Sequence, residues 1–351
     1  MSEPATLLLQ WFSTQQRPLP WRTPFPRDPY LVLLSEVMLQ QTQVERVVPL
    51  YLRFLEKFPD LLTLARASED EVLAAWSGLG YYRRARALRA AAEAIAAAGA
   101  WPSSCDQLRQ LPGFGPYTAA AVAAFSFASD DPPVDGNVAR IAARVLALDA
   151  PRGSVQLARG AEQWVRHLHR TAPTPQLFEA LMELGAQVCR PASPLCHQCP
   201  LAAGCGARAA GAPGRYPAPR PRRPRLAQQW VALWLTRPDG RVLLRQRPPH
   251  QPLGGLWLPP LVELAGDQHP ATAALQLLHG LGYWANLHPA PPVKHAITHR
   301  DLIVFPFGGQ CEPFQVSEAQ GVMWADPFAT GLATSSLTHK LRRAWEEVLG
   351  K

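Results

Sequence analysis

Four cysteines in one short loop constrain this chain more than any other feature. They are spaced C-x6-C-x2-C-x5-C and are Cys189, Cys196, Cys199 and Cys205. A Gly/Pro-rich loop of this kind can fold its thiolates around one centre, either a zinc ion or a [4Fe–4S] cluster. Zinc sites usually pair two C-x2-C elements, whereas here a single pair is flanked by lone cysteines. The spacing therefore favours the cluster, while zinc and unliganded thiols stay as alternatives.

Composition describes a basic, globular chain with more than one domain. Its 351 residues are enough for two or three domains, and 47% hydrophobic residues against 18% charged is typical of folded proteins. The sequence contains no run of about 18 uncharged apolar residues and no signal-peptide pattern at its start. The few cysteines fit a reducing cytosol. The net charge of +8 suggests a polyanionic partner.

The positive charge gathers in the middle of the chain. Residues 184–238 contain eight arginines and no acidic residue, and Ala212–Arg225 reads APGRYPAPRPRRPR. Alternating proline and arginine cannot form a helix or a central strand, because proline lacks the backbone donor and fixes φ. We therefore predict a linker over residues 208–228, which is either a solvated spacer or a spacer that also contacts phosphates.

The two sides of this linker have different patterns. Residues 1–207 predict an all-α domain, with capping boxes at Thr42–Glu45 and Ser68–Glu71. Residues 229–351 predict an α+β domain. Its expected strands are 229–236, 241–247 and 301–307, and its expected helix is 271–280. The fold class is thus a multidomain chain, helical first and α+β second.

A glycine hairpin in the first half suggests a phosphate site. Leu111–Ala120 reads LPGFGPYTAA, in which Gly113 and Gly115 permit close approach and Pro116 suits a first helical turn. Free N–H groups at the start of that helix would bind an anion. By itself the motif also fits an ordinary turn between two helices.

Two acidic residues stand in contrasting contexts. Glu36 lies inside the apolar run 31–39, where burial should raise its pKa and suit it to general acid catalysis. Asp135 precedes an expected helix, whose amides and dipole should favour its ionised form. The simpler interpretations are an exposed glutamate and an ordinary helix cap. One neutral and one ionised acid are what cleavage of a glycosidic bond requires.

The residues directly after Glu36 could contact bases. Leu39, Gln40, Gln41 and Thr42 place an apolar side chain beside polar ones at a helix junction. Amides can bond base edges, and an apolar wedge can fill the space left by an extruded base.

Together these motifs resemble the MutY-type adenine DNA glycosylases, members of the endonuclease III-like, helix-hairpin-helix superfamily. The resemblance extends over the whole chain and rests on Ser35–Val44, the hairpin, Val134–Val138 and the four cysteines. It implies a [4Fe–4S] cluster on those cysteines and removal of adenine opposite 8-oxoguanine or guanine in double-stranded DNA. It also implies a bacterial cytoplasmic, nucleoid-associated protein, which we expect to be a monomer with no membrane partner.

The resemblance also implies roles for individual residues. Glu36 would be the acid acting at adenine N7, and Asp135 would stabilise the sugar cation or attack it, supported by Tyr117 and Asn137. The adenine pocket would contain Trp21, Arg22 and Glu183. DNA contacts would come from Leu39, Gln40, Gln41, Thr42, Tyr81, Gly113 and Gly115.

Tyr117 separates this interpretation from its first rival. A bifunctional glycosylase/lyase acting on oxidised pyrimidines carries a lysine there, whose amine forms a Schiff base, and a phenol cannot do this. We therefore predict a monofunctional enzyme that leaves an abasic site. The second rival is a non-catalytic iron–sulfur DNA-binding protein, which has no need for Glu36 and Asp135 in their contexts.

The second domain resembles a Nudix fold. Val242–Pro248 and Gly254–Pro259 match its early strand and loop, whereas residues 271–280 lack the carboxylates that hold Mg²⁺ in Nudix hydrolases. The domain would then recognise 8-oxoguanine instead of hydrolysing nucleotides. Ile297, Thr298 and His299 align with the family's recognition loop, where Ile297 replaces an aromatic residue.

Overall fold

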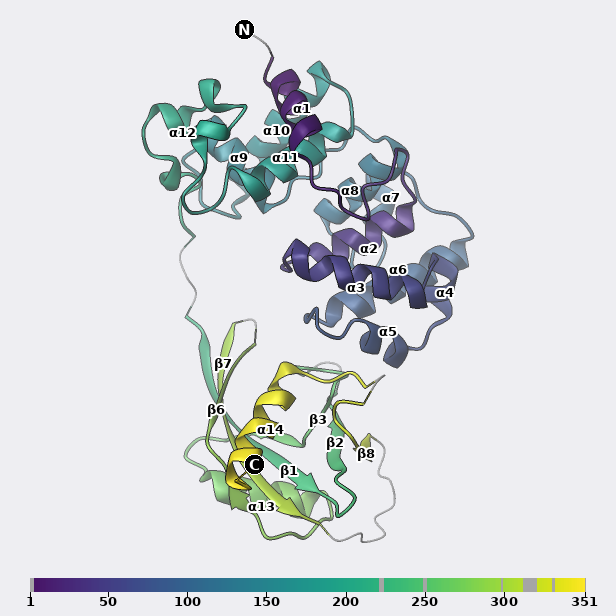
Figure 1. Ribbon diagram of the computed structural model, residues 1–351, viewed down its shortest axis with the longest axis vertical. Coiled ribbons are helices and arrows are strands. Elements are labelled where there is room, and N and C mark those ends of the chain that lie inside the picture. Colours follow the sequence, from purple (N-terminus) through teal and green to yellow (C-terminus); the bar gives the residue numbers. More distant parts are fainter. Residues whose placement is uncertain are drawn as a thin grey trace. The chain divides into compact units, whose positions relative to one another are not determined.

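The computed structural model describes residues 3–220, 224–248, 251–297, 299–311, 321–329 and 332–350. The chain divides into two compact units (Figure 1). The first comprises Met1–Ala67 and Arg83–Arg222, and the second comprises Ser68–Tyr82 and Arg223–Lys351. Within the described residues, no helix is both long and apolar enough to span a bilayer.

The first unit is helical, as predicted. Its α-helices are α1 (Pro4–Gln15), α2 (Pro29–Leu39), α3 (Val44–Lys57), α4 (Leu61–Arg66), α6 (Arg83–Ala98), α7 (Cys105–Leu108), α8 (Pro116–Phe127), α9 (Gly136–Val145), α10 (Val155–Thr171), α11 (Gln176–Gln187) and α12 (Gly206–Ala209). Short 3-10 turns at Cys196–Gln198, Ala202–Gly204 and Pro213–Arg215 complete it.

Helix α2 runs through the centre of this unit. Asp28 caps its start by accepting a hydrogen bond from the Tyr30 backbone N–H (2.8 Å), and Pro29 occupies the first turn, where no backbone donor is needed. Every residue from Val32 to Met38 is buried, because α3, α6 and α8 pack around the helix. An acidic residue at position 36 is therefore forced into the interior.

The two predicted capping boxes have different outcomes. Ser68 and Glu71 form theirs at the start of α5 (Glu69–Ala75), with both reciprocal hydrogen bonds present. The box at Thr42 is wrong: α3 is capped by Gln43, which makes no side-chain bond. The Thr42 hydroxyl instead donates to the Gln40 carbonyl, because this segment is held against the end of α2.

The predicted linker range contains ordered contacts to the helical unit. Ala218 forms a β-bridge with Pro151, and Tyr216 packs beside Ala143, Ala150 and Leu157. The backbone N–H of Arg152 donates to the Ala218 carbonyl at 2.9 Å. The basic segment up to Ala218 therefore lies on α9 and α10, and β1 of the second unit begins at Leu226.

The second unit is built on a mixed sheet, as the α+β prediction requires. The described strands are β1 (Leu226–Thr236), β2 (Val242–Gln246), β3 (Trp257–Leu258), β4 (Leu261–Glu263), β5 (His288–Pro289), β6 (Val293–Ile297), β7 (Arg300–Gln310) and β8 (Val322–Ala325). The sheet order is β3-β2-β1-β7-β5, with β1 and β7 parallel; β4 pairs with β1, β6 with β7 and β8 with β2.

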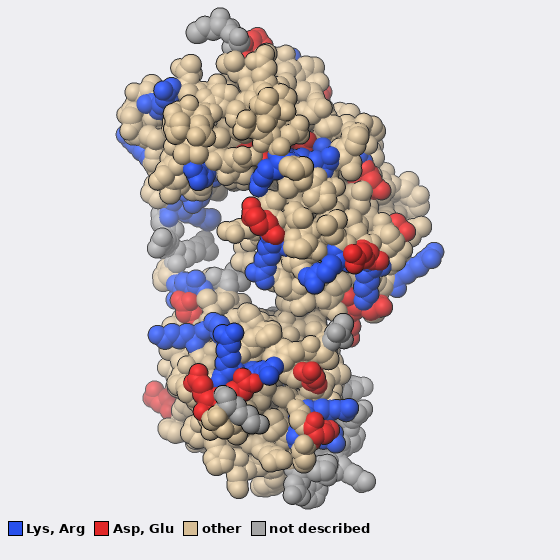
Figure 2. Space-filling model, in the orientation of Figure 1, with Lys and Arg blue, Asp and Glu red and all other residues tan. Residues whose placement is uncertain are grey.

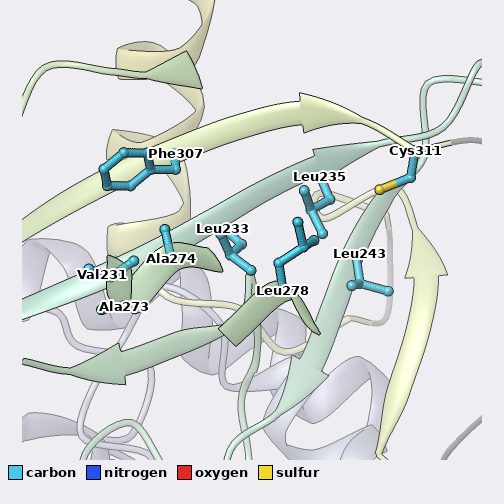
Figure 3. Packing of buried hydrophobic residues seen from close by; sticks show 9 residues of the cluster. All are labelled: Val231, Leu233, Leu235, Leu243, Ala273, Ala274, Leu278, Phe307 and Cys311. Atoms are coloured by element: carbon cyan, nitrogen blue, oxygen red, sulfur yellow. The ribbon is translucent and has the colours of Figure 1, made fainter. Parts of the chain in front are cut away.

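In the described part of this unit, α13 (Pro270–Gly280) and α14 (Ser336–Val348) pack on the sheet. Ala273, Ala274 and Leu278 of α13 pack against alternate residues of β1 and against Phe307 (Figure 3). All of Trp230–Leu235 is buried, since a strand covered on both faces loses the alternation of a half-exposed one. Residues 271–280 form a helix without a carboxylate, as the sequence predicts.

Candidate active site

Glu36 is a buried acid with one short hydrogen bond. Its side chain is 7% exposed, and the Tyr117 hydroxyl donates to Glu36 Oε2 at 2.6 Å. Burial raises the pKa of Glu36 to about 7, while the bond from Tyr117 lowers the pKa and the charge of Asp135 raises it. Tyr117 lies in the first turn of α8, which packs directly on α2. A glutamate with this pKa can hold and release a proton near neutral pH.

Asp135 caps α9 and is oriented by that helix. Its Oδ1 accepts the Val138 backbone N–H at 2.7 Å, and its Oδ2 accepts Asn137 Nδ2 at 2.8 Å. Burial nonetheless raises the pKa of Asp135, and these hydrogen bonds only partly oppose the effect. The contrast between one dry acid and one acid stabilised by helix amides is therefore smaller than the sequence predicts, because both carboxylates are shielded from water.

Both carboxylates line one pocket of about 740 Å³. Tyr117 and Asn137 line it as well, so the structure brings together the four residues expected to act in catalysis. The pocket also contains the three residues expected to bind adenine, Trp21, Arg22 and Glu183. A cavity of this size accommodates a purine nucleotide, and its polar groups converge from elements far apart in the chain.

The pocket holds five charged residues that the sequence analysis missed, Arg17, Arg27, Arg140, Arg152 and Glu179. Arg17, Arg27 and Glu179 join Arg22 and Glu183 in a buried set of ion pairs, here called the Arg–Glu network. The available signals were arginines every five residues before α2 and two glutamates one turn apart in α11.

Glu183 is held between two arginines of this network. Its Oε1 accepts Arg17 Nε at 2.6 Å, and its Oε2 accepts Arg22 Nη2 at 2.8 Å. Although burial opposes ionisation, the hydrogen bonds and charges of both arginines hold the pKa of Glu183 below its ordinary value. This carboxylate is thus ionised and held in a fixed orientation in the pocket wall.

The last residue of α2 and the segment after it line the same pocket. Leu39, Gln40, Gln41 and Thr42 all contribute to its wall. Gln41 has φ 58°, a left-handed conformation that turns the chain sharply. Arg84 Nη1 donates to the carbonyls of Val37, Met38 and Gln40, which satisfies the end of α2 and fixes this turn.

The remaining expected DNA contacts are placed as follows. Gly113 has φ 76°, and a Cβ there would lie 2.5 Å from Ala87 Cβ, so the approach of the hairpin to α6 requires glycine. Gly115 precedes Pro116 at the start of α8, as predicted. Tyr81 is 47% exposed with φ 50° and belongs to the second unit, so it is not placed relative to the pocket.

The four cysteines surround a small cavity of their own. Cys189, Cys196, Cys199 and Cys205 are half-buried free thiols that line it together. Four thiols in one loop are a donor set that an iron–sulfur cluster or a zinc ion can take. Among the described residues, no group is already arranged as a metal site.

Helix α9 connects this loop to the pocket. Arg140 donates to the Asn137 side chain at 2.9 Å and to the Cys189 carbonyl at 2.8 Å. One turn further, Arg144 donates to Cys189 Sγ at 3.3 Å. The helix that presents Asp135 is thus anchored to the cysteine loop by two buried arginines.

The predicted 8-oxoguanine residues lie at the β6–β7 turn. Ile297 ends β6, Thr298 lies outside the described residues, and His299 is exposed just before β7. The His299 carbonyl accepts the backbone N–H of Leu226 at 3.0 Å, so β1 holds the turn in place.

Comparison with known proteins matches both units. Residues 34–167 match the HhH-GPD superfamily of base excision DNA repair proteins, and residues 231–343 match the NUDIX domain. Adenine DNA glycosylase of Rattus norvegicus is 35% identical over 340 residues, which is 82% of this chain and 65% of that protein. The chain thus spans just under two thirds of the rat relative's length.

Two further similarities agree with these. Adenine DNA glycosylase of Mycolicibacterium smegmatis is 42% identical over 210 residues, covering 59% of this chain and 70% of the relative. A solved thermostable thymine-DNA glycosylase shares the fold of the helical part, with a TM-score of 0.52 and 24% identity over 59% of this chain and 95% of that one. From its sequence, its helical fold and these relatives, the chain belongs to the adenine DNA glycosylase family.

Proposed function

We propose that this protein is a monofunctional DNA glycosylase that hydrolyses adenine from A:8-oxoguanine and A:G mispairs in double-stranded DNA and leaves an abasic site. The observation that carries the proposal is the pocket shared by Glu36 and Asp135, two acids on separate elements. The names of the matched relatives support adenine as the base that is removed.

In the proposed reaction, the two acids have different tasks. The target adenosine leaves the duplex and enters the pocket, where Glu183 and Arg22 bind the base beside Trp21. Protonated Glu36 then donates its proton to adenine N7, which turns the base into a neutral leaving group. The Tyr117 hydroxyl stabilises the carboxylate that remains, since it is already bonded to Glu36 Oε2.

Asp135 acts on the deoxyribose from which the adenine departs. As the bond to adenine breaks, positive charge develops on the deoxyribose, and the Asp135 carboxylate stabilises it either electrostatically or as a covalent adduct. Water completes the hydrolysis. Tyr117 is a phenol that cannot form the Schiff base of a lyase, so the strand stays intact.

DNA binding rests on particular elements. On the face seen in Figure 2, Lys and Arg side chains occur in several groups with acidic side chains between them. The glycine hairpin offers backbone N–H groups to a phosphate, and the acid-free segment 184–238 adds arginines. Cys189, Cys196, Cys199 and Cys205 would hold a [4Fe–4S] cluster, which would order this basic loop.

The test is base release from three duplexes, with A opposite 8-oxoguanine, G or T. We expect alkali-labile abasic sites from the first two and none from A:T, with no borohydride-trapped strand cleavage. Replacing His299 by Ala should reduce the preference for 8-oxoguanine over guanine, which tests the recognition turn. Trapped cleavage at stoichiometric yield would contradict the monofunctional assignment.

A further inference from the structure

The last carbonyl groups of helix α2 are bonded mainly by one side chain of another helix. Carbonyls at a helix C-terminus have no partner within the helix. Here the backbone N–H of Thr42 donates to the Leu39 carbonyl at 3.2 Å. Arg84 of α6 bonds the three neighbouring carbonyls through Nη1, those of Val37 (2.8 Å), Met38 (3.1 Å) and Gln40. Its positive charge also complements the negative end of the helix dipole.

The turn that follows α2 requires support of this kind. Gln41 has φ 58°, and a non-glycine residue adopts the left-handed conformation roughly tenfold less readily than its ordinary ones. The segment 39–43 contains no glycine, so tertiary contacts and not local preference impose this conformation. Arg84 supplies contacts on both sides of Gln41, because it binds the Gln40 carbonyl and its Nη2 donates to the Thr42 hydroxyl at 3.4 Å.

The backbone of this turn is held, while its side chains stay accessible. Gln41 is exposed, and Leu39, Gln40 and Thr42 are half-buried; all four line the pocket that contains Glu36. A nucleotide that enters the pocket leaves a gap in the duplex, which an amide side chain beside the pocket can fill. The conformation of the turn therefore bears on extrusion of the base.

We propose that Arg84 is a positioning residue for extrusion of the adenine: by bonding the end of α2 and Thr42, it keeps Gln40 and Gln41 in the conformation that enters the duplex. This inference rests on the proposed function. It assigns Arg84 no contact with the substrate, and loss of Arg84 lowers the population of the extruded nucleotide without disabling the acid.

The acid itself is held by other groups. Glu36 accepts its hydrogen bond from Tyr117 of α8 at 2.6 Å. The segment Val32–Met38 is buried under α3 and α8 as well as under α6. Removal of the Arg84 side chain leaves these supports of the carboxyl group in place. Extrusion of the base and transfer of the proton are therefore separable by experiment.

The test compares Arg84→Met with wild type and with Arg89→Met on a duplex that has adenine opposite 8-oxoguanine. Arg89 is the matched control, because it is a half-buried arginine of the same helix whose Nε donates to the Ala67 carbonyl at 2.7 Å, outside the turn. One measurement is the single-turnover rate of adenine release. The other is the fluorescence rise of 2-aminopurine placed at the target adenine, which reports unstacking of that base.

Arg84→Met should release adenine roughly tenfold more slowly, because the turn adopts its left-handed conformation less often. At saturating protein, its fluorescence rise should be smaller than that of wild type. The rate falls at alkaline pH as Glu36 loses its proton, and the midpoint of this alkaline limb should stay at the wild-type pH. Arg89→Met should match wild type in all three respects.

A wild-type rate in Arg84→Met would overturn the proposal. A slow rate with an undiminished fluorescence rise, or with a shifted alkaline limb, would also overturn it, because either result assigns Arg84 to the cleavage step. Equal losses in Arg89→Met would show a general effect of α6 on the fold instead.

A second variant decides the question if Arg84→Met does not fold. Arg84→Lys keeps the positive charge but lacks the planar fork that reaches several acceptors at once. Its rate of adenine release and its fluorescence rise should both lie below the wild-type values. Wild-type values for both would refute the role of Arg84.

The proposed function can fail separately. Wild-type protein that releases no adenine from either mispair would refute the function, whatever the variants do. Wild-type release together with unaltered release by the Arg84 variants would refute only the role of Arg84.

Discussion

Replacing Glu36 by glutamine should remove base release and, at the same time, stabilise the protein in a pH-dependent way. Below the ordinary pKa of 4.5, Glu36 is protonated in both the folded and the unfolded chain, and its burial costs little. As the pH rises toward about 7, the unfolded chain loses its proton while the folded chain retains it. Stability is therefore lost across this window, and glutamine, which cannot ionise, escapes the loss.

The size of the effect follows from the two pKa values. A difference of one pKa unit corresponds to about 1.36 kcal/mol, so an increase from 4.5 to about 7 costs roughly 3 kcal/mol once Glu36 is ionised in both states. The free energy of unfolding of the glutamine variant, relative to that of the wild type, should therefore increase by roughly 2–3 kcal/mol from about pH 5 to about pH 8. The glutamine side chain can also change the hydrogen bond to Tyr117. That change contributes equally to the variant's stability at both pH values, so it cancels when the two are compared.

The measurement is chemical denaturation of wild type and Glu36→Gln at both pH values. Glu56→Gln is the matched control, since Glu56 is an exposed glutamate on α3. If the stability difference between Glu36→Gln and wild type is the same at both pH values, the raised pKa of Glu36 is refuted. Adenine release by Glu36→Gln at the wild-type rate would refute the catalytic role of Glu36, even if the stability prediction held.

Three further predictions concern neighbouring features. Tyr117→Phe removes the bond to Glu36, worth about 1.5–3 kcal/mol for a charged acceptor, so the alkaline limb of base release should rise by about 1–2 pH units, whereas Tyr30→Phe on α2 should leave it in place. Gly113→Ala should cost about 1–3 kcal/mol more in unfolding free energy than Gly99→Ala, because both have positive φ but only Gly113 meets another side chain; equal losses would contradict the close approach to α6. Cys199→Ser should abolish bound iron and lower the stability of the helical unit, and full iron content in that variant would argue against cysteine ligation.

The sequence predicts those features that depend on residues close together along the chain. The Ser68 capping box, the glycine hairpin, the strand at 229–236 and the buried context of Glu36 are all local patterns, and the structure confirms them. The Thr42 box failed, because contacts from α6 hold the residues after α2 in a different turn.

The sequence by itself determined which groups are present: two acids in apolar and helix-start settings, four closely spaced thiols, and a helical domain followed by an α+β one. Only the tertiary structure decided how these groups influence one another. Arg27 and Glu179 are 152 positions apart, and Arg17 and Glu183 are 166 apart, so no local pattern could pair them. Packing also shielded Asp135 and raised its pKa against the pull of its helix. Charge–charge effects depend on distance and on exclusion of water, and both are set only when distant helices meet.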